Sequence, residues 1–295
     1  MTFALRATTL YGVKVATSQT QLNAYQADAS GECIFVPTMG ALHEGHASLI
    51  RFAASLSRQA PPGGGGCIVS IFVNPTQFDD KADFARYPRT IDDDLLLCER
   101  AGAACVYAPQ VGEVYPPGGG LPLAALPRVA TAPGLEDAAR PGHFAGVCQV
   151  VRRLFELVRP AAAVFGEKDW QQLRVIQAMV RLEGLAIRVV AMPTFREHDG
   201  LAMSSRNRFL SADDRRKGLA LSRALCVANA CATPREAEAM MGRVLAGAGI
   251  VPDYAVVREA AGLEPAESAG EWRALIAARI GPVRLIDNAR WVSQG

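Results

Sequence analysis

Residues 33 to 46 of the chain read Cys33-Ile34-Phe35-Val36-Pro37-Thr38-Met39-Gly40-Ala41-Leu42-His43-Glu44-Gly45-His46. The first four residues form a short, unbroken apolar run, which is typical of a buried strand in a parallel sheet. Proline has no N–H to give to a neighbouring strand, so we expect the strand to end at Pro37. Beyond His46, apolar residues recur with helical spacing over residues 49–53. The sequence therefore predicts a strand, a glycine-containing turn and a helix.

Two of the four histidines, His43 and His46, stand three residues apart at the expected start of this helix. That spacing places both rings on one face of the first turn. A helix start offers N–H groups and a positive dipole end to an anion, and Gly40 and Gly45 leave room beside the backbone. The pattern favours a phosphate site. Two alternatives are a metal pair and plain polar loop residues, although no further ligands with zinc spacing follow nearby.

The composition is that of an ordinary globular protein with 295 residues, half of them hydrophobic and a fifth charged. A formal net charge of +2 gives no general reason to expect binding to nucleic acid or to an anionic membrane. No apolar run approaches membrane-spanning length. Seven cysteines without metal spacing, and a start without an export pattern, favour reduced thiols in a cytoplasmic protein. We therefore expect small-molecule partners.

A second buried strand is expected over residues 67–73, after a flexible glycine-rich loop at Pro61–Gly66. Strand, helix and strand at this spacing indicate a right-handed parallel crossover. The polar residues Asn74 and Gln77 follow this strand, and ligands of parallel sheets bind beyond the carboxyl ends of the strands. A proline turn capped by Asn74 explains the same residues without a ligand.

An acidic run, Asp92-Asp93-Asp94, opens the next predicted helix after Thr90. A threonine cap and acidic residues in the first turn suit the helix dipole, which is the simplest explanation. A magnesium ion held through water by Asp93 or Asp94 is the alternative.

Further polar groups follow later strands and turns. Arg140 has the planar fork that binds a carboxylate or phosphate. Lys168 lies three residues beyond the end of an expected strand over residues 161–165 and supplies a compact cation. The last parallel strand is expected over residues 187–193, and the loop Met203-Ser204-Ser205-Arg206 follows it.

These elements predict an α/β fold, in which a Rossmann-like parallel sheet carries helices on both faces. This domain is expected to occupy residues 1–194. A smaller C-terminal α+β domain, residues 195–295, is expected to act as a lid. The residues before Gly12 are expected to be a loose extension.

The motifs together resemble the pantothenate synthetase family, also called pantoate–β-alanine ligases, of the HxGH nucleotidyltransferase superfamily. The resemblance spans roughly residues 31 to 210 and is most specific at Pro37–His46 and at residues 166–172, which match the family pattern GEKDxQQ. The loop Met203–Arg206 resembles the KMSKS loop of class I adenylating enzymes. The chain departs from the family over residues 116–133 and at Leu135-Glu136-Asp137, where the family has Leu-Glu-Gly.

The resemblance implies a two-step reaction. The carboxylate of pantoate attacks the α-phosphate of ATP, giving an enzyme-bound pantoyl adenylate and pyrophosphate. The amine of β-alanine then attacks the acyl carbon and releases AMP. Because the adenylate already activates the acyl group, no covalent nucleophile is needed, and the enzyme works by positioning and electrostatics. The resemblance also implies Mg²⁺ as a cofactor and a homodimer.

The residue roles follow block by block. The implied catalytic residues are His46, His43, Lys168 and Arg206. The implied ATP contacts are Met39, Gly40, Ala41, Leu42, His43, Glu44, Gly45, His46, Gly166, Glu167, Lys168, Asp169, Phe195, Met203, Ser204, Ser205 and Arg206. The implied contacts to pantoate and β-alanine are Gln77, Gln172, Asn74, Pro37, Thr38 and Arg140.

Three other functions share part of this pattern. Another small-molecule adenylyltransferase of the same superfamily would keep the histidine turn. A shortened aminoacyl-tRNA synthetase would need a basic tRNA-binding surface, for which the composition gives no sign. A nucleotide sensor without catalysis would have little reason to keep His43, His46, Lys168 and Arg206 together.

Overall fold

The computed structural model describes residues 7–29, 31–59, 65–78, 81–118, 126–266 and 271–292, and for residues 81–83 the backbone alone. The chain divides into two compact units. Unit 1 comprises the described residues up to Pro127 together with Arg140–Gly166 and Val175–Met192, and unit 2 comprises Arg128–Ala139, Glu167–Arg174 and the described residues from Pro193 onward. Whether these units act as the main domain and lid expected from the sequence stays a prediction.

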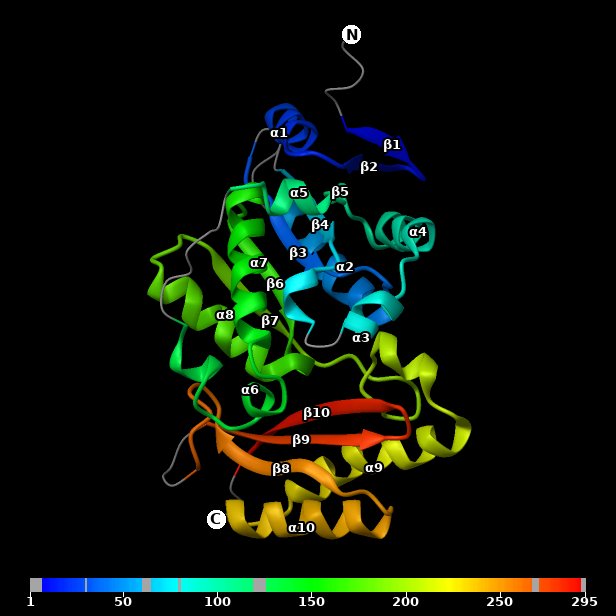
Figure 1. Ribbon diagram of the computed structural model, residues 1–295, viewed down its shortest axis with the longest axis vertical. Helices are drawn as coiled ribbons and strands as arrows, with labels where there is room; N and C mark the ends of the chain where they lie inside the picture. Colours follow the sequence, from blue (N-terminus) through cyan, green and yellow to red (C-terminus); the bar gives the residue numbers. More distant parts are fainter. Residues whose placement is uncertain are drawn as a thin grey trace. The chain divides into compact units, whose positions relative to one another are not determined.

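Unit 1 is built on a seven-stranded sheet whose order is β1-β2-β5-β4-β3-β6-β7 (Figure 1). Its strands are β1 (Thr8–Leu10), β2 (Val13–Ala16), β3 (Ile34–Thr38), β4 (Cys67–Ile71), β5 (Cys105–Tyr107), β6 (Ala162–Gly166) and β7 (Arg188–Met192). All neighbouring pairs are parallel except β1 and β2. The expected loose extension before Gly12 is therefore wrong for residues 8–10, which pair with β2 as an exposed edge strand.

The helices of unit 1 cover both faces of this sheet, as expected. They are α1 (Gln19–Asp28), α2 (Glu44–Arg58), α3 (Lys81–Arg86), α4 (Ile91–Ala101), α5 (Val111–Val114), α7 (His143–Val158) and the part of α8 (Trp170–Leu182) from Val175 onward. Side chains alternate along a strand, so Ile34 and Val36 pack with α2 and α4, whereas Phe35 meets Phe155 of α7 at 6.3 Å between ring centroids.

Pro37 does not end strand β3, contrary to the sequence prediction. The ladder with β4 continues through Pro37 and Thr38, while the ladder with β6 covers only Ile34 and Phe35. Ile34 donates its N–H to Gly66 on the β4 side, and alternation turns the N–H position of residue 37 the other way. The proline therefore interrupts only the ladder with β6.

The strand order reverses direction at β3. The chain proceeds from β3 to β4 and β5 on one side, and later strands β6 and β7 add on the other side. In open parallel sheets a ligand binds at such a switch point, outside the carboxyl ends of the strands. The histidine turn follows the carboxyl end of β3, so the topology of unit 1 places it where a ligand is expected.

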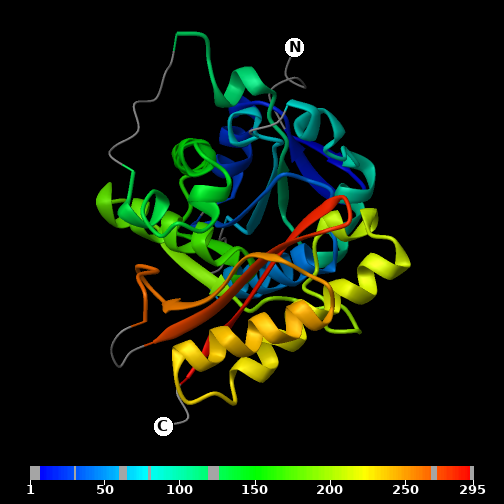
Figure 2. The same cartoon turned by 60° about the horizontal axis from the view of Figure 1, so that its bottom comes forward.

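Unit 2 has a three-stranded antiparallel sheet of order β10-β9-β8. The strands are β8 (Pro252–Glu259), β9 (Trp272–Ile280) and β10 (Val283–Trp291), and the helices α9 (Ala212–Ala228) and α10 (Pro234–Gly247) lie side by side against them (Figures 1 and 2). Their apolar faces form one core around Leu221, Leu225 and Met241. Short segments join this unit, namely η3 (Arg128–Ala130), α6 (Glu136–Ala139), η4 (Glu167–Asp169), the start of α8 and η5 (Ser205–Phe209). The expected C-terminal α+β architecture is thus present.

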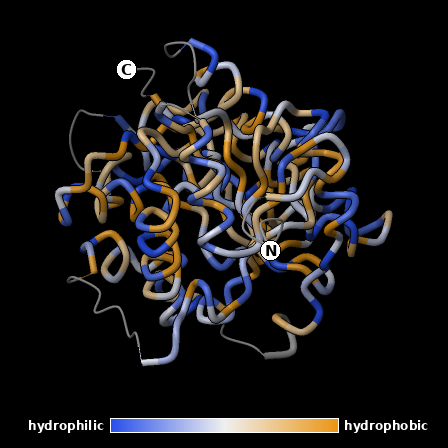
Figure 3. The backbone as a smooth tube through the Cα atoms, turned by 90° about the horizontal axis from the view of Figure 1, so that it is seen from above, coloured by the Kyte–Doolittle hydropathy of each residue, from blue (hydrophilic) through white to orange (hydrophobic). Residues whose placement is uncertain are grey.

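Apolar and polar residues alternate in short stretches along the chain, as the tube in Figure 3 shows. Within the described residues, no helix combines the length and the apolar character needed to cross a membrane. Most of the glycine-rich loop expected at residues 61–66, and the middle of the divergent loop 116–133, lie outside the described residues.

Candidate active site

The turn after β3 is held by a buried carboxylate. Gly40 has φ +80° and Ala41 has φ +50°, so both residues adopt the left-handed region. Asp94, which is 2% exposed, accepts the backbone N–H groups of Ala41 at 3.0 Å and Leu42 at 2.8 Å. A Cβ atom on Gly40 would lie 2.9 Å from the Asp94 carboxylate, so this position requires glycine. Asp94 therefore fixes the turn that carries the histidines.

This role bears on the expected magnesium site. Asp94 also accepts the hydroxyl of Thr90 at 3.2 Å, so Thr90 stands at the N-cap position of α4 but bonds the carboxylate. Burial raises the pKa of Asp94. Asp93 is exposed, and among the described residues no group of three or more His, Cys, Asp or Glu could hold a metal ion. Asp94 is thus engaged in the turn after β3, and a magnesium ion held through water by Asp93 or Asp94 stays a prediction.

His43 and His46 form a paired start to α2. His43 is the N-cap residue, and its backbone N–H donates to Nδ1 of His46 at 3.3 Å. The ring centroids are 4.0 Å apart. Because Nδ1 of His46 accepts a hydrogen bond, the proton of the neutral ring sits on Nε2. The first turn thus offers an imidazole N–H in addition to the dipole of the helix start, and both suit an anion.

Other residues of the same block have partners within the protein. The Thr38 hydroxyl donates to the Ser70 carbonyl at 2.6 Å and accepts the N–H of Gly40 at 3.2 Å. Glu44 forms an exposed ion pair with Arg51 at 2.8 Å. These three contacts support the local structure, whichever ligand the turn binds.

The turn after β4 is a 3-10 turn, η2 (Pro75–Gln77), capped by Asn74. Asn74 is 1% exposed and donates both amide hydrogens, to Oε1 of Gln77 at 3.1 Å and to the Gly146 carbonyl at 3.2 Å. The capped proline turn anticipated as an alternative is therefore present. Because its donors are committed, Asn74 acts on Gln77 and is poorly placed to bind a substrate through its amide N–H groups.

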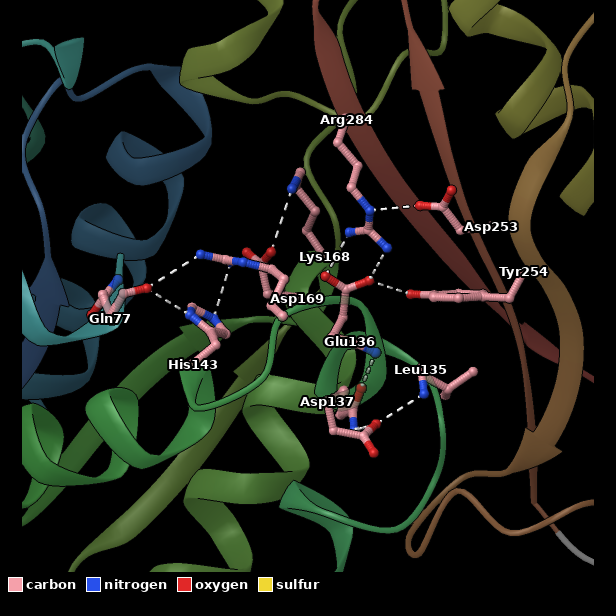
Figure 4. A network of polar contacts seen from close by, with 12 residues as sticks. Gln77, Leu135, Glu136, Asp137, His143, Lys168, Asp169, Asp253, Tyr254 and Arg284 are labelled. Carbon is pink, nitrogen blue, oxygen red and sulfur yellow. Dashed lines mark hydrogen bonds and ion pairs between the residues drawn. The ribbon is translucent and has the colours of Figure 1, made fainter. Parts of the chain in front are cut away.

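Gly146 lets helix α7 approach this turn. A Cβ atom at residue 146 would lie 2.4 Å from the Thr76 carbonyl oxygen and 2.9 Å from Cα of Gln77. Nδ1 of His143 and Nη2 of Arg140 contact the Gln77 carbonyl oxygen at 3.0 and 3.3 Å (Figure 4). Helix α7 and the residues before it therefore hold the backbone of Gln77.

The two turns of unit 1 meet through Gln77. Its amide Nε2 lies 2.8 Å from the sulfur of Met39, in the histidine turn. Four residues expected from the sequence to bind substrate or nucleotide are thus brought together: Met39, Asn74, Gln77 and Arg140.

In unit 2, Lys168 lies in the 3-10 turn η4 (Glu167–Asp169) that follows β6. Its ammonium is 3.5 Å from Asp169 (Figure 4), and its side chain is 20% exposed. The carbonyl groups of Glu167 and Lys168 both accept hydrogen bonds from Asn288 of β10. The turn is therefore fastened to the sheet of unit 2 through its backbone.

The adjacent glutamines at the start of α8 differ in their surroundings. Gln171 is 3% exposed, accepts the N–H of Glu136 at 2.9 Å and donates to Val129 and Asp137 at 2.9 Å each. Gln172 is half-buried, and no described residue bonds its amide. Of the pair, only Gln172 has an amide that is available to a ligand.

The loop Met203–Arg206 leaves a small hairpin in which Arg196 and Ala202 form an antiparallel bridge. Ser204 caps η5 by accepting the N–H of Arg206 at 3.3 Å. Ser205 and Arg206 are half-buried, and Phe195 before the hairpin is 38% exposed. The loop therefore presents hydroxyl and guanidinium groups on a well-defined backbone.

Sequence reasoning missed the residues that support these turns. Asp94 was considered only for a cap or a metal, and Gly146, Arg273, Asp287 and Asn288 were not considered at all. The pair Asp287-Asn288 interrupts an otherwise largely apolar strand, and this is the signal that could have identified it.

Comparison with known proteins settles the family. A family model described as pantoate–β-alanine ligase matches residues 13–290. The chain belongs to the pantoate–β-alanine ligase family. It is a ligase that joins pantoate to β-alanine with ATP. The family resemblance and the reaction type inferred from the motifs are thus confirmed.

Individual relatives agree with this assignment. The pantothenate synthetase of Acidothermus cellulolyticus is 44% identical over 288 residues, which cover 93% of this chain and 90% of the relative. The crystal structure of pantothenate synthetase from Thermus thermophilus is similar with a TM-score of 0.84 and 38% identity, covering 93% of this chain and 98% of that one. The Francisella tularensis ligase, solved in complex with beta-gamma ATP and β-alanine, has a TM-score of 0.75 and 30% identity, covering 94% and 97%.

Proposed function

We propose that the ligase works through an enzyme-held pantoyl adenylate. A carboxylate oxygen of pantoate attacks the α-phosphorus of ATP, and the bond from that phosphorus to the bridging oxygen breaks, so that pyrophosphate leaves. The amine of β-alanine then attacks the acyl carbon and forms the amide bond. The bond from that carbon to the bridging oxygen breaks, so that AMP leaves with this oxygen and the nitrogen loses a proton. Both substrates are anions, so each step needs positive groups at the phosphates.

The observation that carries this proposal is the held histidine pair. The N–H of His43 fixes Nδ1 of His46 as an acceptor, so Nε2 of His46 bears the proton that a phosphate oxygen accepts. The start of α2 adds its dipole to the same anion. A fixed donor needs little reorganisation when charge develops in the transition state.

The other residues take roles that their chemistry supports. Lys168 and Arg206 bind phosphate oxygens. Ser205 and the other ATP contacts implied by the family resemblance bind the rest of the nucleotide. Gln77, held by Asn74 and Met39, and Gln172 bind pantoate. Arg140 assists on an anionic group while it holds the Gln77 carbonyl. Asn74 holds the side chain of Gln77, and Thr38 holds the backbone N–H of Gly40.

Magnesium enters with ATP in this proposal, because no group of three or more His, Cys, Asp or Glu among the described residues could hold a metal ion. The residues of the chain then bind the phosphates and not the ion. A homodimer and a cytoplasmic location remain parts of the proposal, and sedimentation in solution tests the first.

Pyrophosphate exchange tests the two-step route. With enzyme, magnesium, ATP and pantoate but no β-alanine, labelled pyrophosphate should appear in ATP, and omission of pantoate should abolish the exchange. AMP release should stay slow until β-alanine is added, because a closed site protects the mixed anhydride from water. Full pantothenate synthesis without any exchange would point to a concerted route and end the proposal.

The His46→Ala variant tests the role of the held imidazole. Loss of one preorganised donor should raise the barrier to adenylate formation by about 2–4 kcal/mol while the protein still folds. A single-turnover burst of pyrophosphate at the parent rate would remove His46 from the phosphate site.

Another adenylyltransferase would show exchange with an acid other than pantoate.

A further inference from the structure

Two consecutive buried polar residues, Asp287 and Asn288, lie in the middle of β10, and each is 3% exposed. Side chains alternate along a strand, so the two point to opposite faces of the unit 2 sheet. Buried polar groups are costly unless they are fully hydrogen-bonded. The partners of this pair therefore indicate what it is for.

Asn288 fastens the turn that carries Lys168. Its amide donates to the carbonyl oxygens of Glu167 at 3.0 Å and Lys168 at 2.8 Å. Its Oδ1 atom accepts a hydrogen bond from Nε of Arg273 at 2.6 Å. Both amide hydrogens of Asn288 are thus donated to the carbonyl oxygens of the two peptide groups that flank the Cα atom of Lys168.

Arg273 of β9 reinforces the same turn. Its guanidinium forms an ion pair with Glu167 at 2.8 Å and stacks over the Trp170 ring at 3.8 Å from the centroid. Trp170 in turn donates its indole N–H to the Ala260 carbonyl at 3.0 Å. The backbone around Lys168 is therefore held on both sides.

Asp287 fastens the second phosphate-binding segment. Its two carboxylate oxygens accept hydrogen bonds from Nη1 and Nη2 of Arg196 at 2.8 and 2.9 Å. Arg196 also donates to the Gly200 carbonyl at 3.1 Å, which closes the hairpin leading to Arg206. A bidentate pair of this kind fixes orientation as well as distance.

Charge is balanced in these supports. Asp287 is paired with Arg196, and Glu167 with Arg273, so these supporting side chains add no net charge. Lys168 and Arg206 then supply the positive charge for phosphate. Since a misplacement of about 1 Å can cost roughly 100-fold in rate, the supports matter for catalysis as well as for folding.

We propose that Asp287 and Asn288 are positioning residues of the ligase, Asn288 acting through Lys168 and Asp287 acting through the hairpin that carries Arg206. Neighbouring positions of one strand thus hold both phosphate-binding segments of unit 2 at a fixed spacing. The inference rests on the phosphate roles of Lys168 and Arg206 proposed above.

A double-mutant cycle tests the action of Asn288 through Lys168. Asn288→Asp keeps the shape but turns an oxygen toward two carbonyl oxygens. We expect it to weaken ATP binding in calorimetric titration and to lower kcat/KM for ATP about 10- to 100-fold, with pantoate affinity unchanged. In a Lys168→Ala background the same change should cost less than about twofold, because the residue it positions is gone.

Trp291→Phe is the matched control. Trp291 lies on the same strand, is fully buried and also donates to a backbone carbonyl, that of Ala228 at 2.7 Å. Its replacement should lower Tm but leave ATP affinity and kcat/KM within about twofold of the parent. Should Asn288→Asp not fold, Asn288→Ser, which keeps one donor, replaces it in the same cycle.

A parallel cycle tests Asp287. Asp287→Asn should lower kcat/KM for ATP, and this loss should vanish in an Arg206→Ala background. Losses that add fully in both cycles, or unchanged ATP affinity in the Asn288 variant, would overturn the inference. If the parent makes pantothenate without pyrophosphate exchange, the proposed two-step route fails and the ATP titrations still decide this inference. If the parent does not bind ATP, both fail.

Discussion

Neighbouring residues of one motif do different work in this protein. Gln171 and Gln172 have the same side chain, yet Gln171 makes three hydrogen bonds inside unit 2 and Gln172 makes none with the described residues. A sequence motif therefore identifies a functional segment, but the burial of each residue shows whether its side chain stabilises the fold or is available to a ligand.

The glutamine pair gives a direct prediction. Gln172→Ala should raise KM for pantoate at least about tenfold with little change in Tm, because a polar contact to a small substrate is lost. Gln171→Ala should lower Tm, since it leaves the N–H of Glu136 and the carbonyl of Val129 unpaired. Steady-state kinetics and calorimetry on both variants check this. A pantoate KM that follows Gln171 and not Gln172 would reverse the assignment.

The cysteines allow a second prediction at this scale. Five of the seven are buried, and burial raises the pKa of Cys98, Cys105 and Cys148 to about 12. The thiolate is the reactive form, so these thiols stay protonated and shielded at about pH 8. A thiol reagent should rapidly label only the exposed Cys226 and the partly exposed Cys231, and all seven after denaturation. Fast native labelling of more than two would contradict this.

At the scale of elements, the start of α4 supports the turn after β3. Asp94 accepts two N–H groups of that turn, and Gly40 makes room for it. The contact joins segments that lie far apart in the chain, so a residue of one helix shapes the start of another.

The Asp94→Asn variant tests this support. An amide group would turn a donor toward one of the two N–H groups, which should cost about 1–3 kcal/mol of stability and weaken ATP binding. The exposed neighbour Asp93 is the control, and Asp93→Asn should change neither quantity. A marked rise in the magnesium requirement of the Asp93 variant would revive the metal hypothesis for that residue.

At the scale of the whole molecule, each unit has its own core, and unit 2 recruits segments from the middle of the chain. Segment 128–139 joins it through Glu136, which forms a bidentate pair with Arg284 at 2.7 and 2.8 Å and accepts the Tyr254 hydroxyl at 2.7 Å (Figure 4). Asp137 accepts hydrogen bonds from the backbone N–H groups of Gly134 and Leu135.

Removing this anchor should loosen the segment. Glu136→Ala leaves Arg284 and Tyr254 without their buried partner, so we expect a loss of about 3–5 kcal/mol in stability and faster amide exchange over residues 135–139. Glu264→Ala is the control, because its pair with Arg128 on the same segment is exposed, and it should cost less than about 1 kcal/mol. Equal exchange in both variants would show that Glu136 is not the anchor.

The sequence alone determined the local elements and the chemistry. Apolar runs followed by polar turns predicted the parallel strands, and the apolar spacing over residues 49–53 predicted helix α2, because these patterns depend on neighbours in the chain. The residue types at the turns, read with the family resemblance, predicted the ligase.

Only the tertiary structure decided which of these residues are held, and by what. The ladder through Pro37 depends on a neighbouring strand on one side, and Asp94, Gly146 and Asn288 act on turns far away in sequence. The interruption of an apolar strand can single out a pair such as Asp287 and Asn288, but the sequence does not show which distant residues a buried polar side chain bonds. Burial and long-range hydrogen bonding are properties of the folded chain, and they separate the supporting residues from those available to substrate.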